Sequence, residues 1–190
     1  MKVILGSQSE GRREVLSSMG YKFEILNPNI NEKTIRSEDP TKLTLALANA
    51  KADALLPEIK NKEPTILITS DQVVVWDGKV REKPQTKEEA RKVLASYSVK
   101  PAETVTAVVA TNTANQKRVN GVDIARVWFK KIPEEVIERI IRQGEIFSHA
   151  GGFSITDLLL EEYVAEVEGA IDSVIGLPKE LTNRLIREVS

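Results

Sequence analysis

Close to its start the chain reads Val3-Ile4-Leu5-Gly6-Ser7-Gln8-Ser9-Glu10-Gly11-Arg12-Arg13, an apolar strand that runs through a polar turn into a helix. Free backbone N–H groups and the helix dipole favour negative charge at such a helix N-terminus. Small residues let the backbone approach a ligand closely, and the arginines offer planar, forked donors that match phosphate oxygens. The stretch therefore predicts an anion-binding site at the end of a strand.

The same stretch also has a purely structural interpretation. Ser9 is an ordinary helix N-cap, and Gly20 is a suitable C-terminal stop for the helix. Successive helical residues point about 100° apart, so Arg12 and Arg13 cannot both face one ligand. We expect one arginine to bind phosphate and the other to pair with a carboxylate. A capped helix with solvated arginines stays an alternative.

Along the rest of the chain, segments rich in β-branched and apolar residues alternate with segments typical of helices. The predicted strands are Val3–Leu5, Lys22–Leu26, Thr65–Thr69, Val73–Trp76, Lys79–Arg81, Thr104–Thr111 and Val122–Phe129. The predicted helices, besides the one after Ser9, are Thr41–Ile59, Lys87–Ser96, Pro133–Gln143 and Pro178–Val189. This alternation predicts an α/β fold, and the hairpin described below makes its sheet mixed.

We expect residues 1–190 to form a single domain, because the chain is long enough for one substantial core with two lobes. The predicted loops are Pro57–Pro64, Asn112–Asn120 and His149–Phe153. Each of them is too short to separate two independent domains.

The composition excludes several classes of protein. The absence of cysteine excludes a disulfide framework and a cysteine nucleophile, and the single histidine, His149, argues against a multi-histidine metal site. The chain has 27 basic and 28 acidic residues, so it has no global attraction to nucleic acid or to an anionic membrane. No apolar run approaches the about 20 residues of a transmembrane helix. We expect a cytoplasmic protein that binds neither membrane nor polymeric nucleic acid.

A β-hairpin is expected to bring two charged residues together. Asp77-Gly78 is a strong two-residue turn signal between two apolar strands. Continued pairing of these strands sets Lys83 opposite Gln72 and beside Asp71. A regular hairpin would point Asp71 and Lys83 to opposite faces of the sheet. We therefore expect the pairing to break near Pro84, a bulge to re-aim one residue, or the lysine side chain to span the gap.

Asp71 is the main candidate for chemistry. It follows the apolar strand Thr65–Thr69, and ligands of open α/β sheets bind outside the carboxyl ends of strands. Asp71 could hold a divalent metal ion or accept a proton from an attacking water, although closing an Asx turn is the structural alternative. Glu32 and Lys51 carry less weight. For Lys51, which is surrounded by alanines, a solvated surface position is the simpler interpretation.

These motifs, taken in order, resemble those of the Maf-type nucleoside triphosphate pyrophosphatases, and the resemblance covers nearly the whole chain. It rests on Leu5-Gly6-Ser7-Gln8-Ser9 with Arg12-Arg13, Glu32, Ala48-Asn49-Ala50-Lys51-Ala52, Ser70-Asp71-Gln72, Lys83-Pro84, Ala150-Gly151-Gly152 and Val174-Ile175-Gly176-Leu177-Pro178. The resemblance implies a long twisted mixed sheet with two lobes around a central cleft, and homodimers are common in the family.

The resemblance also implies an activity and a site. Family members hydrolyse a nucleoside triphosphate to the monophosphate and pyrophosphate with Mg²⁺ or Mn²⁺. By matching position, Asp71 is the proton acceptor and, with Glu32, a metal ligand. The residues implied to bind substrate are Ser7, Ser9, Arg12, Arg13, Lys51 and Lys83. We expect the lysines to keep Asp71 ionised.

Three positions bear on the choice of base, namely Gly11, Gln72 and Thr156. Gln72 resembles the branch of the family that acts on 7-methyl-GTP, whereas Gly11 and Thr156 match neither that branch nor the one that prefers dTTP and UTP. Because Gly11 cannot stack on a base, we expect a roomier pocket there, with Asp157 as a substitute carboxylate. The candidate substrates are 7-methyl-GTP, UTP, dTTP and CTP.

Two other functions stay open at the level of sequence. A nucleotidyltransferase has a similar strand, loop, arginine and lysine at its start, although its loop normally carries more glycine. A non-catalytic nucleotide-binding regulator of cell division could use the same pocket without turnover.

Overall fold

The structure is a computed structural model that describes residues 2–59 and 64–190, so part of the predicted loop Pro57–Pro64 lies outside the described residues. Within these residues the strands form one seven-stranded sheet in the order β2-β1-β3-β5-β6-β7, with β4 paired to β3. β1 pairs parallel with β2 and β3, whereas the β3–β4 and β6–β7 pairs are antiparallel. The predicted α/β class with a mixed sheet is confirmed.

The bounds of the elements follow the chain. The strands are β1 (Lys2–Gly6), β2 (Phe23–Leu26), β3 (Thr65–Trp76), β4 (Lys79–Arg81), β5 (Ala102–Asn112), β6 (Arg118–Phe129) and β7 (Val164–Glu168). The helices are α1 (Glu10–Ser18), α2 (Pro40–Leu55), α3 (Lys87–Ser96), α4 (Glu134–Gln143), α5 (Leu158–Glu161), α6 (Ile171–Ile175) and α7 (Lys179–Val189). Short 3-10 turns are η1 (Glu32–Thr34), η2 (Glu145–Ser148) and η3 (Ala150–Gly152).

Two predictions about the elements are wrong, and one strand was not predicted. β3 is one continuous strand, so Asp71 lies inside it and not beyond its end. β7 was not predicted, because its sequence Val-Ala-Glu-Val-Glu has no regular apolar alternation and the strand, the last in the sheet order, is mostly exposed. α2 ends at Leu55 and not at Ile59, because Pro57 has no N–H with which to continue the helical hydrogen bonds.

The chain divides into two compact units. Unit 1 comprises Met1–Gln72, Thr106–Asp123 and Ile175–Ser190, and unit 2 comprises Val73–Val105 and Ile124–Val174. β3, β5 and β6 each contribute residues to both units.

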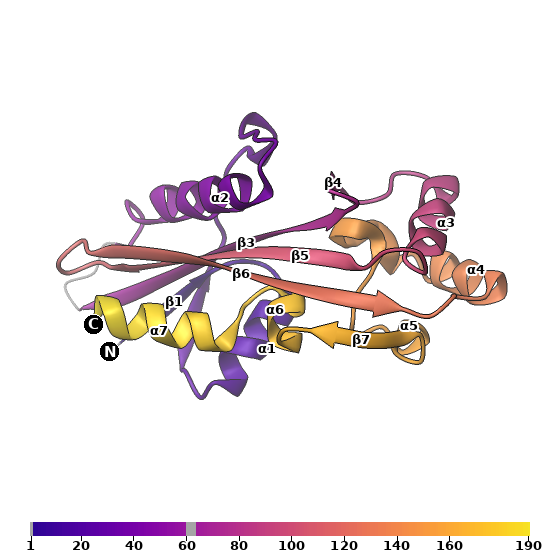
Figure 1. The fold of residues 1–190 in the computed structure, drawn as a ribbon. Helices are drawn as coiled ribbons and strands as arrows, with labels where there is room; N and C mark the ends of the chain where they lie inside the picture. Colours follow the sequence, from indigo (N-terminus) through magenta and orange to yellow (C-terminus); the bar gives the residue numbers. More distant parts are fainter. Residues whose placement is uncertain (1, 60–63) are drawn as a thin grey trace. The chain divides into compact units, whose positions relative to one another are not determined.

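Unit 1 has helices on both faces of its strands. α2 covers one face, and α1 with α7 cover the other (Figure 1). Alternation along β1 explains the two layers, because Ile4 packs toward α2 while Val3 and Leu5 pack toward α1 and α7. Ala48 and Ala52 of α2 are fully buried, and their small side chains let this helix approach the strands closely.

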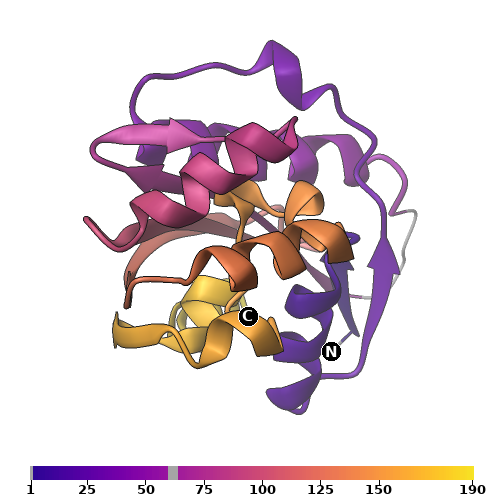
Figure 2. The same ribbon diagram turned by 90° about the vertical axis from the view of Figure 1, so that its right-hand side faces the viewer.

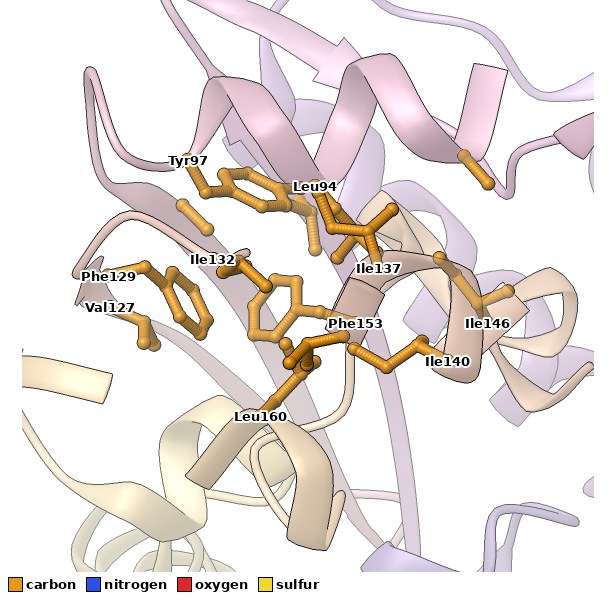
Figure 3. Close-up of a cluster of buried hydrophobic side chains, with 14 of the residues drawn as sticks. Leu94, Tyr97, Val127, Phe129, Ile132, Ile137, Ile140, Ile146, Phe153 and Leu160 are labelled. Atoms are coloured by element: carbon orange, nitrogen blue, oxygen red, sulfur yellow. The ribbon is translucent and has the colours of Figure 1, made fainter. Parts of the chain in front are cut away.

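Unit 2 is built around α3 and α4, which lie side by side (Figure 2). Their apolar faces pack with β6 residues into one cluster, in which three aromatic rings meet (Figure 3). The predicted hairpin turn is present, since Asp77 and Gly78 both have positive φ and Trp76 pairs with Lys79. None of the helices in the described part of the chain is both long and apolar enough to cross a membrane.

Candidate active site

The turn after β1 is folded by its serines. The Ser9 hydroxyl accepts a hydrogen bond from the Arg12 N–H at 3.4 Å, and the Ser7 hydroxyl accepts one from the Ser9 N–H at 3.2 Å. Gly6 is required here, because a Cβ at this position would lie 2.6 Å from Leu55 Cδ1 and 2.7 Å from Thr69 Cγ2. The helix cap that sequence offered as an alternative is therefore present, and it holds Ser7 buried at the end of β1.

Arg12 ties three segments of unit 1 together. Its Nε donates to the Gly176 carbonyl at 2.9 Å, and its Nη1 donates to the Ser70 carbonyl at 2.8 Å and to the Ser7 hydroxyl at 3.4 Å. The Ser70 hydroxyl donates to the same Gly176 carbonyl at 2.9 Å. Gly176 has a φ of 108°, which favours glycine. The guanidinium thus fixes the β1 turn to β3 and to the segment before α7.

Arg13 points elsewhere. Its Nη2 donates to the exposed Gln8 carbonyl at 3.4 Å. Within the described residues neither Arg12 nor Arg13 forms an ion pair with a carboxylate, so the prediction that one of them does is wrong. Backbone carbonyls accept from both guanidinium groups, although the buried Arg13 Nε has no hydrogen-bond partner among the described residues. Backbone partners cannot be recognised from the order of side chains in the sequence.

Lys51 is the centre of a charged cluster. Its Nζ lies 2.6 Å from Asp71 Oδ1 and 2.8 Å from Glu32 Oε1. The Lys51 and Asp71 side chains are only 9% and 8% exposed, whereas that of Glu32 is 53% exposed. The simpler interpretation of Lys51 as a surface lysine is therefore wrong, because the closely packed α2 carries it against β3. The structure brings Glu32, Lys51 and Asp71 together from three separate segments.

Burial dominates the electrostatics of this cluster. It raises the pKa of Asp71 above its ordinary value, and the positive charges of Lys51 and Arg12 oppose the shift. Burial also lowers the pKa of Arg12, while Asp71 and Glu32 act in the opposite direction. The expectation that nearby lysines keep Asp71 ionised therefore needs correction, since the loss of water around the carboxyl has the larger effect on its pKa.

Two of the three positions expected to select the base lie beside the segment before α7. A Cβ on Gly11 would lie 2.7 Å from Ile175 Cγ2, so the Ile175 side chain fills the space next to Gly11. The prediction of extra room at this position is wrong. Gln72 donates from Nε2 to the Thr106 hydroxyl at 2.7 Å, and its Cδ lies 3.6 Å from where a Cβ on Gly176 would be.

Lys83 and Thr156, the remaining site predictions, belong to unit 2. The β3–β4 ladder ends at the Val74–Arg81 pair, so the pairing stops before Lys83. A break in the pairing near Pro84 was one of the three arrangements expected from the sequence. Asp157 uses its carboxylate to cap α5, accepting from the Leu159 N–H at 2.8 Å. The approach of Lys83 to Asp71 and the role of Thr156 in choosing the base stay predictions.

Sequence reasoning assigned no role to Ser70 or to the Gly176 carbonyl. Both residues lie in motifs that carry the family resemblance. Gly176, which stands between Ile175 and Leu177, was the available signal that the backbone here has a special conformation. Their role is to give Arg12 its acceptors.

A divalent cation suits part of this cluster. No group of three or more acidic or histidine side chains converges within the described residues. Glu32 and Asp71 nevertheless converge on a single cation, the Lys51 ammonium. Mg²⁺ is commonly held by one or two carboxylates together with substrate phosphates, so this pair of carboxylates fits such an ion.

Comparison with known proteins finds relatives over nearly the whole chain. The chain is 44% identical over 193 residues to a 7-methyl-GTP pyrophosphatase of Dictyostelium discoideum, covering 99% of this chain and 97% of that protein. It is 35% identical to a dTTP/UTP pyrophosphatase of Vibrio vulnificus, covering 98% of each. Among solved structures, the Ham1 protein of Staphylococcus aureus matches 69% of this chain and 73% of that chain at 10% identity, with a TM-score of 0.43.

The family resemblance predicted from the motifs is confirmed by a family model. The model described as "Maf-like protein" matches residues 2–189. It therefore spans the β1 turn, Lys51, Asp71 and the segment before α7 in one match. The chain belongs to the Maf-like protein family.

Proposed function

We propose that this protein hydrolyses a nucleoside triphosphate to the nucleoside monophosphate and pyrophosphate. The observation that carries the proposal is the buried contact of Lys51 with Asp71, with Glu32 on the same ammonium. A buried carboxylate with a raised pKa in a charged cluster is typical of a functional site. The names of the relatives, which are pyrophosphatases of nucleoside triphosphates, support the same activity.

The first step is binding of the triphosphate. Ser7 and Ser9 supply the polar turn beside the α1 N-terminus, where negative charge is favoured. Arg12 keeps this turn against β3, and its positive charge adds to that of Lys51. Arg13, which is half-buried, and Lys83, which is exposed, are the cations that we assign to the outer phosphates. Glu32 and Asp71 would hold a divalent ion, which supplies charge stabilisation to the phosphates when it is bound.

The second step is attack by water on the α-phosphorus. Asp71 accepts the proton of this water as the new P–O bond forms, and the bond between the α-phosphorus and the bridging oxygen breaks. Pyrophosphate leaves with the electron pair of that bond. A base is most effective when its pKa lies near the working pH, and the raised pKa of Asp71 moves in this direction. Positioning and charge stabilisation supply the rest.

We propose 7-methyl-GTP as the first substrate to test. The Dictyostelium relative named for this substrate is 44% identical, against 35% for the dTTP/UTP relative. Gln72, whose amide is fixed by Thr106, matches the 7-methyl-GTP branch in the resemblance drawn from sequence. UTP, dTTP and CTP are the comparison substrates. Mg²⁺ or Mn²⁺ as the cofactor, a cytoplasmic location and a homodimer stay predictions.

The test is a screen for pyrophosphate release with these four nucleotides, each with Mg²⁺ and with Mn²⁺. We expect turnover that Asp71→Asn abolishes. Asp53→Asn is the matched control, because Asp53 also lies on unit 1 and pairs with Arg118, but its side chain is 66% exposed. Binding of every nucleotide without turnover would instead favour a regulator, and turnover that needs an acceptor alcohol would favour a nucleotidyltransferase.

A further inference from the structure

The backbone around Lys83 is held in place although it belongs to no helix or strand. The Glu82 carbonyl accepts a hydrogen bond from the Gly151 N–H at 3.2 Å. The Lys83 carbonyl accepts one from the Gln85 side chain at 2.8 Å. Pro84 is buried, whereas the Lys83 side chain is exposed. The segment therefore fixes the backbone of Lys83 and leaves its ammonium available.

The partner of this segment is the turn at Gly151 and Gly152. Both residues have positive φ, 65° and 63°, which favours glycine. A Cβ on Gly152 would lie 3.2 Å from Pro84 Cγ. A Cβ on Gly151 would lie 2.5 Å from Val74 Cγ1 and 2.9 Å from the Tyr97 hydroxyl. The turn thus packs tightly against the residues on both sides of Lys83, and side chains are excluded from it.

Tyr97 fixes this turn from the hydrophobic core of unit 2. Its hydroxyl donates to the Gly151 carbonyl at 2.6 Å, and the residue is 1% exposed. Its ring centroid lies 5.6 Å from that of Phe129 and 5.5 Å from that of Phe153, so the ring is locked by its neighbours (Figure 3). Burial raises the pKa of Tyr97 to about 12, which keeps the hydroxyl protonated as a donor.

The hydroxyl is not needed for packing. Phe129 and Phe153 occupy the same cluster without one, and burying a hydroxyl costs free energy unless it is hydrogen-bonded. The hydroxyl donates to the Gly151 carbonyl, in the residue whose N–H binds Glu82, and the Arg81 side chain is a second neighbour of it. A chain of contacts therefore runs from the Tyr97 ring through Gly151 to the backbone next to Lys83.

We propose that Tyr97 is a positioning residue for Lys83, acting through the Gly151–Gly152 turn. The proposal rests on the function proposed above, in which Lys83 binds the outer phosphates. Tyr97 touches neither substrate nor metal in this scheme. Its hydroxyl restricts the turn, and the turn restricts the Glu82–Pro84 backbone. Because this backbone is already fixed, Lys83 loses less conformational entropy when its ammonium binds substrate.

The test is Tyr97→Phe, measured alone and together with Lys83→Ala. We expect Tyr97→Phe to lower kcat/KM about 3- to 10-fold, the range that corresponds to one hydrogen bond, chiefly through a higher KM. In the Lys83→Ala background the same change should have no further effect, since the group that it positions is gone. Tyr163→Phe is the matched control, because Tyr163 packs against the same cluster and should leave kcat/KM unchanged.

A second measurement does not depend on activity. Amide hydrogen exchange should become faster at Gly151 and across residues 82–86 in Tyr97→Phe, and not in Tyr163→Phe. Unchanged exchange there, or an equal loss of kcat/KM in both backgrounds, would overturn the role of Tyr97. If Lys83→Ala itself leaves kcat/KM unchanged, the assignment of Lys83 under the proposed function fails, and the exchange experiment alone decides whether Tyr97 holds the segment.

Discussion

Replacing Asp71 with asparagine should separate catalysis from stability. The change preserves the shape of the side chain and removes its negative charge. Loss of a general base lowers turnover by about 10²- to 10⁴-fold, and we expect kcat to fall by at least this range. Breaking a buried ion pair usually destabilises a protein by about 3–5 kcal/mol, because one charge is left without a partner. We expect no such loss here.

The reason lies in the surroundings of the carboxyl. Lys51 keeps Glu32 at 2.8 Å after the change, so its charge is not left unpaired. Burial raises the pKa of Asp71 above its ordinary value of 3.8, which means that the folded state holds the proton more tightly than the unfolded state does. The contribution of Asp71 to the free energy of unfolding of the wild type is therefore complete below about pH 3.8. It is lost as the pH rises through the pKa of Asp71 in the folded state. Each unit of separation between the two pKa values corresponds to about 1.4 kcal/mol.

Urea unfolding of both proteins between pH 4 and pH 8 checks this reasoning. The difference in free energy of unfolding should shift in favour of Asp71→Asn as pH rises, because asparagine has no charge to bury. Pyrophosphate release from the preferred nucleotide is measured on the same samples. If Asp71→Asn is less stable than the wild type by about 3 kcal/mol or more at pH 7, this expectation is refuted. The attraction between Lys51 and the Asp71 carboxylate would then be larger than the cost of burying that carboxylate.

Three further outcomes are expected. Gly11→Ala should destabilise the wild type by about 1–3 kcal/mol, because the added methyl group would overpack against Ile175. The same change should have no effect on stability in Ile175→Ala. Thermal unfolding of the wild type, the two single variants and the double variant measures this coupling energy. Arg12→Lys should cost about 1–3 kcal/mol in urea unfolding even though charge is retained, because an ammonium cannot reach the acceptors that the guanidinium holds. Burial lowers the pKa of His149, so its single imidazole NMR signal should titrate below pH 6.5, and wild type should lose stability relative to His149→Gln as pH falls below that value. A titration midpoint above 6.5 would contradict the last expectation.

The elements that sequence predicted well are those set by local chemistry. α3 has the predicted bounds, because Thr86 caps it and two glutamates fill its first turn. The Asp77-Gly78 turn was predicted because positive φ at both positions demands such residues. The family was predicted because its motifs carry the turn, the lysine and the aspartate in order.

The features that sequence missed depend on tertiary partners. Lys51 is buried because alanines on α2 let the helix approach β3, and helical periodicity alone does not reveal how close two elements come. Arg12 binds backbone carbonyls of Ser70 and Gly176, and backbone acceptors are the same for every residue type. The filling of the space beside Gly11 by Ile175 joins positions at opposite ends of the chain.

The continuity of β3 shows why the functional residues were hard to place. Ser70, Asp71 and Gln72 interrupt an apolar pattern, so sequence indicates a break in the strand. Each polar side chain instead finds a partner, in the Gly176 carbonyl, Lys51 and Thr106 respectively, and the strand continues. The raised pKa of Asp71 reflects the free-energy cost of burying its carboxylate, and an apolar residue at position 71 would avoid that cost. A carboxylate in so unfavourable a place, next to an ammonium and an arginine, is better explained by the catalytic role that we propose for it than by the stability of the strand.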